Sequence, residues 1–192
     1  MSLIGKQFPD ISVKSINSDG DEMRVNLHKP NVPTVLFWYP KDFTFVCPTE
    51  IIAFAERAKE FNDRGFQVFG ASCDTCEVHF AWLNTPQKDG GIEGVSFPII
   101  ADSTRALSKE LDILDEEDNV TYRATYLIDA EGRCFHASVN DMPIGRNIDE
   151  LLRLIDAKLH VDKFGEVCPA GWQKGDTAVN ATRQGIADYL SK

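Results

Sequence analysis

The sequence lacks a long hydrophobic run, an excess of basic residues, and any internal repeat or low-complexity tract. No apolar stretch approaches the ~18 residues of a membrane-spanning helix, so no membrane partner is expected. The start of the chain has no apolar core of a secretory signal peptide, which predicts a cytoplasmic protein. A formal net charge of −10 argues against nucleic acids and anionic membrane surfaces as main partners.

Cysteine is scarce, at five residues in a chain of 192. In a reducing compartment these thiols should be mostly free, and a disulfide among them would more often be catalytic than structural. The length suggests one domain with enough chain to bury a good core. The chemistry of the protein is therefore sought at its cysteines.

The centre of the chain predicts a βαβ unit. An apolar run at residues 35–39 is typical of a buried strand. Helical spacing follows from Cys47 to Phe61, and Gly65 lies where a C-cap is expected. A second apolar run at residues 66–72 predicts another strand, and strand, helix and strand at this spacing indicate parallel pairing with a right-handed crossover.

Further elements complete an α/β pattern. Residues 8–16 carry a weak strand signal, and residues 103–111 predict a helix with Ser103 as its N-cap. The segments 120–129 and 133–139 flank an Asp-Ala-Glu-Gly turn and predict a β-hairpin.

The chain changes character at His160, after an amphipathic helix. Residues 161–182 are rich in Gly, Lys and Asp and show poor periodicity before a short final helix. We therefore expect a core domain over residues 1–160 and an appended arm over residues 161–192.

Cys47 is expected in the first turn of the helix that follows the central strand. A cysteine reacts as its thiolate, and an ordinary thiol with a pKa of about 8.5 is only roughly 3% ionised at pH 7. Making such a thiol about 90% thiolate takes about 3.4 kcal/mol, whereas a helix N-terminus supplies ~0.3–1 kcal/mol, or about 2 when partly buried. A cation and hydrogen-bond donors must also reach the sulfur. Thr44 is placed to offer a hydroxyl, and an arginine is the favoured cation because it keeps its charge.

The residues from Pro40 to Glu50 resemble the active-site signature of peroxiredoxins. The pattern is Pro40, three residues, Thr44, two residues and Cys47, continued by Pro-Thr-Glu. The fuller string from Asp42 resembles the typical 2-Cys branch, which includes the C subunit of alkyl hydroperoxide reductase. The alternative is a buried, inert cysteine, since free cysteine is among the most buried residue types. Burial alone gives no reason for the Pro, Thr and helix-start context.

The resemblance implies a thioredoxin-like fold: a central mixed β-sheet flanked by helices, with an extended C-terminal arm. It also implies a thiol-dependent peroxidase for hydrogen peroxide and organic hydroperoxides, in which Cys47 is oxidised to a sulfenic acid. Pro40 would shield the pocket from water, and Thr44 with backbone N–H groups would stabilise the developing negative charge. No metal, flavin or haem cofactor is expected.

Two arginines and a glutamate join the predicted site through the resemblance. From spacing alone, Arg123 reads as a surface charge at a strand end. The string from Arg123 to Asp129 resembles the family's second fingerprint, in which the arginine contacts the peroxidatic sulfur and the bound peroxide. The resemblance makes Glu50 an active-site acid with Arg146 hydrogen-bonded around it. A surface charge at a helix start explains Arg146 equally well.

The stretch Glu166-Val-Cys-Pro-Ala-Gly-Trp172 resembles the resolving-cysteine motif of the 2-Cys branch. In the family this cysteine, here Cys168, forms a disulfide with the peroxidatic cysteine of the partner subunit. A thiol reductant, whether thioredoxin, a flavoprotein disulfide reductase or a small CxxC protein, then regenerates both thiols. The resemblance implies a homodimer, assembled into a ring of five dimers. The alternative for Cys168 is a small hydrophobe at a packed interface.

Two other functions stay open. Cys73 and Cys76 form a CxxC pair followed by His79, which is typical of a thiol–disulfide oxidoreductase or of part of a zinc site. The dithiol interpretation expects the pair directly after the first strand of the βαβ unit, where a threonine and Cys47 stand, and the zinc interpretation lacks a fourth ligand. The second function is a holdase chaperone, which some family members resemble. Cys134, on a strand that looks exposed, matches no motif.

Overall fold

The computed structural model describes residues 2–191 and divides them into two compact units, one ending at Arg146 and the other beginning at Asn147. The first unit holds a seven-stranded sheet, a two-stranded ribbon and helices α1 to α4. The second holds α5 (Ile148–Phe164) and α6 (Arg183–Leu190). Across the described residues, no helix is long and apolar enough to cross a membrane.

The first unit is built around a mixed sheet with the strand order β2-β1-β5-β4-β3-β8-β9. Its strands are β1 (Val13–Ile16), β2 (Glu22–Val25), β3 (Thr34–Trp38), β4 (Gln67–Ser72), β5 (Ile99–Ala101), β8 (Arg123–Ile128) and β9 (Cys134–Asn140), and the ribbon is β6 (Leu114–Asp115) with β7 (Val120–Thr121). Strand β3 pairs parallel with β4 and antiparallel with β8. The predicted βαβ unit, the β8–β9 hairpin and the mixed α/β class are confirmed.

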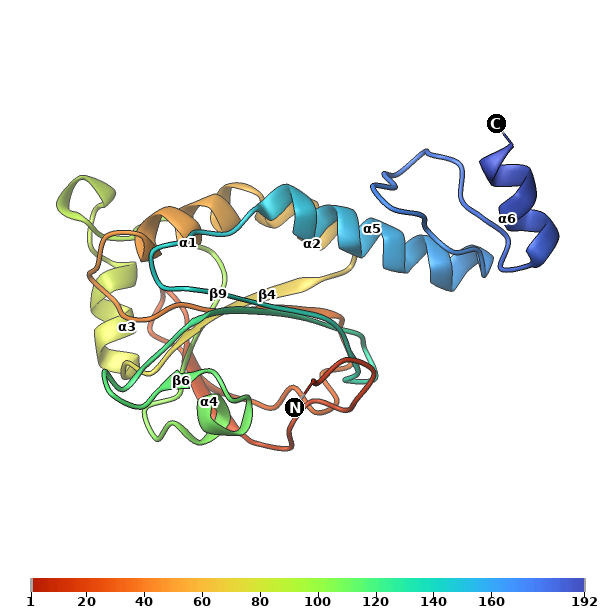
Figure 1. Cartoon of the computed structure of the whole chain (residues 1–192). Helices are drawn as coiled ribbons and strands as arrows, with labels where there is room; N and C mark the ends of the chain where they lie inside the picture. The colour runs from red at the N-terminus through yellow and green to blue at the C-terminus, as the bar shows by residue number, and fades with distance from the viewer. Residues whose placement is uncertain (1, 192) are drawn as a thin grey trace. The chain divides into compact units, whose positions relative to one another are not determined.

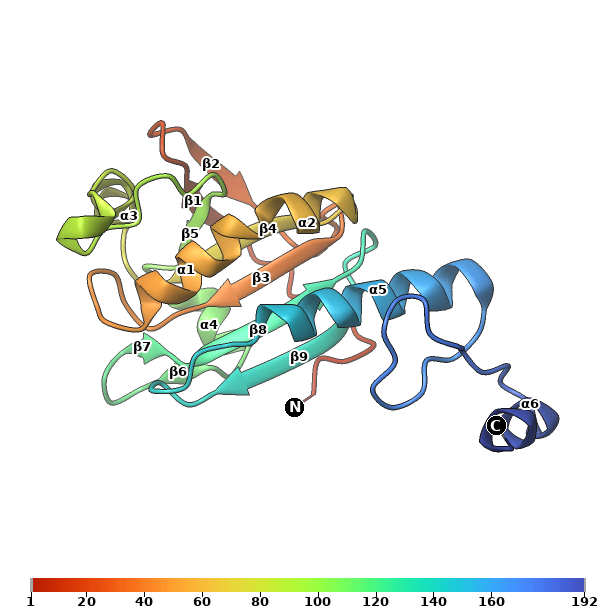
Figure 2. The same cartoon turned by 90° about the horizontal axis from the view of Figure 1, so that it is seen from above.

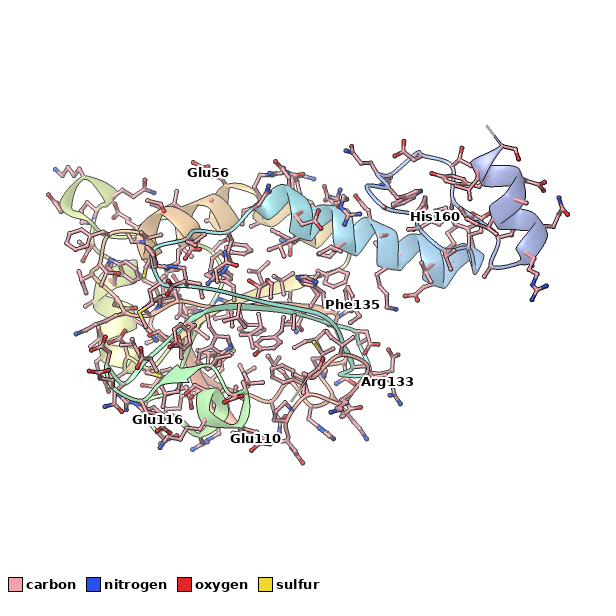
Figure 3. All side chains as sticks on the ribbon, viewed as in Figure 1. Glu56, Glu110, Glu116, Arg133, Phe135 and His160 are labelled. Atoms are coloured by element: carbon pink, nitrogen blue, oxygen red, sulfur yellow. The ribbon has the colours of Figure 1, made fainter. Side chains whose placement is uncertain are left out.

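Helices cover both faces of this sheet (Figure 1). The helices are α1 (Cys47–Glu56), α2 (Ala58–Asp63), α3 (Cys76–Leu83) and α4 (Ala106–Glu110), with a short 3-10 helix η1 (Gln87–Asp89). Helices α1 and α2 lie on one face, α4 and the N-terminal segment on the other, and α3 packs beside β1 and β5 (Figure 2). Glu56, at the end of α1, lies on the outer surface of its layer (Figure 3).

The aromatic packing under α1 and α2 explains why these helices lie where they do. All five residues of β3 are buried, so its alternating side chains serve both faces of the sheet. On the α1 side, the ring of Phe37 stacks on Phe54 with centroids 4.0 Å apart, and Phe54 meets Phe61 at 5.8 Å. Such aromatic pairs add to the free energy of burying their surface. These contacts hold α1 and α2 against the face of the sheet from which the Phe37 ring projects.

The single helix predicted from Cys47 to Phe61 is wrong, because the chain forms two helices there. Arg57 has φ −101° and ψ 4°, outside the α-helical range, and its N–H bonds to the carbonyl of Ala55. The break separates α1 from α2 while Phe61 stays in contact with the ring of Phe54. Gly65, with φ 78°, follows the end of α2 as expected of a C-cap residue.

The predicted N-cap Ser103 is also wrong. Helix α4 begins at Ala106, and the side chain of Asp102, rather than that of Ser103, accepts hydrogen bonds from the N–H groups of its first turn. The Asp102 carboxylate accepts hydrogen bonds from the backbone N–H groups of Leu107, at 3.2 Å, and Ser108, at 2.8 Å. Asp102 can do this because Arg105 adopts the left-handed conformation, with φ 59°, and turns the chain back over the carboxylate.

Cys134 is fully buried, so the expectation of an exposed strand is wrong at this position. The N-terminal segment covers it: the N–H of Gly5 donates to the Cys134 carbonyl, and the Cys134 N–H donates to the carbonyl of Lys6. Burial raises the pKa of the Cys134 thiol to about 11. This thiol is therefore protonated at neutral pH and unsuited to nucleophilic chemistry.

The second unit is a long helix followed by an irregular segment and a short helix. Helix α5 starts with Asn147, whose side chain accepts from the Glu150 N–H, and it continues past His160 to Phe164. His160, marked in Figure 3, bonds to Glu166 at 2.8 Å and contacts the ring of Trp172 at 4.9 Å. These contacts fold the segment that carries Cys168 back along α5.

Candidate active site

Cys47 is the first residue of α1 and is 1% exposed. Val46 occupies the N-cap position without a side-chain hydrogen bond, and Pro48 follows within the first turn. Proline suits this turn because its N–H groups have no partners within the helix. The positive end of the helix dipole therefore lies at the Cys47 sulfur, and it favours a negative charge there.

Arg123 reaches the same sulfur from the neighbouring strand. The register that pairs Phe37 of β3 with Thr125 of β8 brings Arg123, at the start of β8, to the place where the chain leaves β3. Its Nη1 lies 3.4 Å from the Cys47 Sγ, and its Nε donates to the carbonyl of Met142 at 2.5 Å. Arg123 is buried, so the surface-charge interpretation from spacing alone is wrong.

Glu50 lies one turn along α1 and gathers both arginines. Its carboxylate accepts from Arg123 Nη1 at 2.6 Å and from the backbone N–H of Arg146 at 3.1 Å. The Arg146 Nε lies 3.7 Å from Glu50, its Nη2 donates to the carbonyl of Trp38, and its guanidinium lies 5.4 Å from the centre of the Phe37 ring. Burial lowers the pKa of Arg146 to about 10, against the opposing effect of Glu50, so Arg146 stays charged at neutral pH.

The formal charges of the side chains around Cys47 do not balance. Arg123 and Arg146 each carry a positive charge, Glu50 carries one negative charge, and the side chains of both ion pairs are only 4% exposed. With a neutral thiol the cluster holds one uncompensated positive charge, whereas with a thiolate at Cys47 it is neutral. Because an unpaired buried charge is costly, a negative charge at the Cys47 sulfur would complete the charge balance of the cluster.

Pro40 and Thr44 flank the loop that leads into α1. Pro40 is buried and lies two residues after the end of β3. The Thr44 hydroxyl donates to the carbonyl of Lys41 at 2.8 Å, within the same loop, so its hydrogen is directed away from the sulfur in this conformation. The shielding role of Pro40 and the hydroxyl contact of Thr44 stay predictions.

Neither a reactive dithiol nor a zinc site is supported at the CxxC pair by the contacts of its residues. Burial raises the pKa of both thiols, and the sulfur of Cys73 lies 3.7 Å from the Ser108 hydroxyl. Both ring nitrogens of His79 are already bonded, to Asp42 and to the carbonyl of Ile100. Within residues 2–191, no group of three or more His, Cys, Asp and Glu side chains is arranged to hold a metal ion.

Cys168 belongs to the second unit and is partly exposed. Its thiol lies 3.7 Å from the carbonyl of Ala157. Partial burial raises the pKa of Cys168; Arg153 opposes the rise and Glu166 adds to it. All five cysteines are free thiols in this structure, so the pairing of Cys168 with Cys47 stays a prediction.

Comparison with known proteins decides the family. The model of the AhpC/TSA family matches residues 4–136, which is more than half of the chain. The chain belongs to the AhpC/TSA family of peroxiredoxins. It is 50% identical to alkyl hydroperoxide reductase C of Helicobacter pylori strain J99, over 99% of this chain and 97% of that protein. It is 44% identical to peroxiredoxin-1 of Gekko japonicus, over 98% of this chain and 96% of that protein.

Peroxiredoxin structures confirm the thioredoxin-like fold. The reduced 2-Cys peroxiredoxin of Plasmodium vivax aligns over all of both chains with a TM-score of 0.96 and 39% identity. A second family model, the C-terminal domain of 1-Cys peroxiredoxin, matches residues 160–192. That matched segment carries Cys168 in this chain. As a peroxiredoxin, the protein is a thiol-dependent peroxidase.

Several groups at the site were missed by sequence reasoning. The carbonyl groups of Met142 and Trp38 orient the two arginines, and backbone carbonyls carry no sequence signal. The contact of Phe37 with Arg146 has a partial sequence signal, because Phe37 lies in the apolar run that predicts the buried central strand. Asp42 lies inside the quoted motif, yet nothing in the motif indicates its partner.

Proposed function

We propose that Cys47 is the peroxidatic cysteine of this peroxidase and that Cys168 of a second subunit is the resolving cysteine. The observation that carries the proposal is the buried cluster of Glu50, Arg123 and Arg146, which places the Arg123 guanidinium 3.4 Å from the Cys47 sulfur. The cluster supplies the positive charge that a reactive cysteine needs, because the helix N-terminus alone is too weak to stabilise a thiolate. The structure and the comparisons give the CxxC oxidoreductase and the holdase chaperone no support.

In the first step, the Cys47 thiolate attacks one oxygen of a hydroperoxide. An S–O bond forms to the terminal oxygen, which keeps its hydrogen, and the O–O bond breaks. The leaving oxygen takes a proton from solvent and departs as water or an alcohol. Cys47 becomes a sulfenic acid. Arg123 lies 3.4 Å from the sulfur and is placed to stabilise the negative charge that develops on the peroxide oxygens. Thr44 contributes its hydroxyl once the hydrogen turns from Lys41, and Pro40 excludes water.

In the second step, the Cys168 sulfur of the partner subunit attacks the sulfenic sulfur. An S–S bond forms, the S–O bond breaks, and water leaves. A dithiol reductant then supplies two electrons by thiol–disulfide exchange and returns both cysteines to thiols. Thioredoxin, a flavoprotein disulfide reductase and a small CxxC protein are the candidate reductants.

The assembly and compartment are part of the same proposal. An intersubunit disulfide requires at least a homodimer, and we infer a ring of five dimers working in the cytoplasm. In this arrangement residues 1–160 form the peroxidase domain and residues 161–192 the arm that delivers Cys168.

The test is a denaturing gel without reductant, after one equivalent of hydrogen peroxide. Wild type, Cys47→Ser and Cys168→Ser are compared, with Cys134→Ala as the matched control for a cysteine outside the site. Wild type and the control should give a covalent dimer, and both serine variants should stay monomeric. A disulfide that survives in both serine variants and disappears with Cys73→Ala would contradict the proposal.

A further inference from the structure

The proposed function, on which this inference rests, creates a problem of access. Cys47 is 1% exposed, so a cysteine from a second subunit cannot reach its sulfur in this conformation. The loop of residues 41–46 leads into Cys47 and must move before the disulfide can form. The contacts that hold this loop therefore control how long a sulfenic acid at Cys47 stays enclosed.

Asp42 is the one buried side chain of this fully described loop. Phe45 is 94% exposed and Phe43 52% exposed, and the Thr44 hydroxyl bonds only within the loop. Asp42 is 4% exposed and is held on three sides. Its carboxylate accepts from the Tyr39 hydroxyl at 2.8 Å and bonds to His79 at 2.7 Å, and its N–H donates to Asp74 at 2.9 Å.

The partners of Asp42 belong to the scaffold rather than to the loop. Tyr39 follows β3, His79 is a fully buried residue of α3, and Asp74 follows β4. The His79 Nε2 faces the carbonyl of Ile100 on β5, at 3.2 Å, so this nitrogen must carry a hydrogen. The other nitrogen and the Asp42 carboxylate then share one proton, which makes the pair neutral overall and strongly bonded.

The loop is strained at the next residue. Phe43 adopts the left-handed conformation, with φ 53°, which is unfavourable for a bulky side chain. Its ring contacts Trp82 of α3 at 5.7 Å, so α3 holds both Asp42 and Phe43. Opening the loop would relieve the strain at Phe43, and the Asp42–His79 contact opposes that relief.

We propose that Asp42, His79 and Tyr39 form a latch that keeps the Cys47 loop closed, and that Asp42 and His79 are positioning residues for the resolving step. While the latch holds, a sulfenic acid at Cys47 can react with a second hydroperoxide, giving a sulfinic acid and an alcohol or water. When it releases, Cys47 becomes available to Cys168. The strength of the latch sets the ratio of disulfide to sulfinic acid.

The test uses a graded series in the full-length protein. Asp42→Ala removes the contacts to His79 and Tyr39. Asp42→Asn keeps the hydrogen-bond geometry without the ionic character, and Tyr39→Phe removes one hydroxyl from a retained ring. Asp102→Ala is the matched control, because it removes a buried carboxylate with two hydrogen bonds in another part of the first unit.

Two quantities are measured after a pulse of hydrogen peroxide: the rate of disulfide formation by rapid quench, and the sulfinic fraction by mass spectrometry. Asp42→Ala should speed disulfide formation about tenfold and lower the sulfinic fraction, with the other two latch variants in between. If Asp42→Ala does not fold, Asp42→Asn and Tyr39→Phe are used for the test. Asp102→Ala should leave both quantities as in wild type.

The outcomes separate the latch from the proposed function. A wild-type protein that forms no sulfenic acid at Cys47 would overturn both. A wild type that forms it, with the same ratio of disulfide to sulfinic acid in every latch variant, would overturn the latch alone. A change of equal size in Asp102→Ala would also overturn it, since general destabilisation would then suffice.

Discussion

A single nitrogen of Arg123 serves two partners. Its Nη1 contacts both the Cys47 sulfur and the Glu50 carboxylate, while its Nε is fixed by the Met142 carbonyl. A planar guanidinium can hold three directions at once, whereas a lysine ammonium on a flexible stem cannot reproduce them. The position therefore depends on arginine geometry as well as on positive charge.

We expect Arg123→Lys to lower the rate of Cys47 oxidation by hydrogen peroxide by a factor of about 10²–10³, the effect of losing one oriented charge-stabilising group. Stopped-flow measurement of the first oxidation step would check this. Arg133→Lys, on the exposed β8–β9 turn, is the matched control and should react like wild type. Equal rates for the two variants would mean that charge alone is sufficient at residue 123.

For the thiols of the CxxC pair, we expect replacement to leave the peroxidase rate nearly unchanged. Because burial raises the pKa values of Cys73 and Cys76, little of either is thiolate at neutral pH. A Cys73→Ala, Cys76→Ala double variant should retain the peroxidase rate within about twofold, since neither thiol takes part in the chemistry. A coupled peroxidase assay with an excess of a small dithiol would measure it. A loss comparable to that of Cys47→Ser would restore the CxxC mechanism.

At the scale of elements, the starts of helices α1 and α4 differ in how their first turns are used. Helix α1 has no side-chain cap, because the N–H groups of Thr49 and Glu50 bond to the backbone carbonyl of Val46. Cys47 is the first residue of this helix and lies at the positive end of its dipole, which suits a reactive centre. Helix α4 is capped by Asp102 from the preceding strand end, which suits a structural element. The start of α1 thus holds a cysteine, whereas the start of α4 is closed by a carboxylate.

Asp102→Ala should lower the free energy of unfolding by about 1–2 kcal/mol, because two N–H groups lose their acceptor. Ser103→Ala, next to it in sequence, should change the free energy by less than about 0.5 kcal/mol, as surface substitutions usually do. Urea unfolding at equal protein concentration would compare them. A larger effect at Ser103 would show that the cap lies where the sequence pattern placed it.

At the scale of the whole molecule, the proposed mechanism requires two subunits. Cys47→Ser chains retain Cys168, and Cys168→Ser chains retain Cys47. If the disulfide joins subunits, mixing the two variants under conditions of subunit exchange and adding peroxide should produce a covalent dimer that neither gives alone. Mixed Cys47→Ser and Cys47→Ser, Cys168→Ser chains provide the control without a peroxidatic cysteine. A mixture that stays monomeric would contradict an intersubunit disulfide.

The sequence by itself determined the local features of this protein. Apolar runs and helical spacing predicted the βαβ unit, the hairpin and the place of Cys47 at a helix start, because these depend on neighbours a few residues apart. The motif around Cys47 indicated the family before any geometry was known. Single-residue boundaries were less certain, as the break at Arg57 and the cap at Asp102 show.

Only the tertiary structure decided which distant side chains meet. Spacing made Arg123 a surface charge, yet the β3–β8 register buries it against Cys47, 76 positions away in the chain. The N-terminal segment buries Cys134, and Asp42 finds His79 across 37 positions. Such contacts depend on how sheet and helices pack, and hydrophobic periodicity determines which face of an element is buried without determining what lies opposite it.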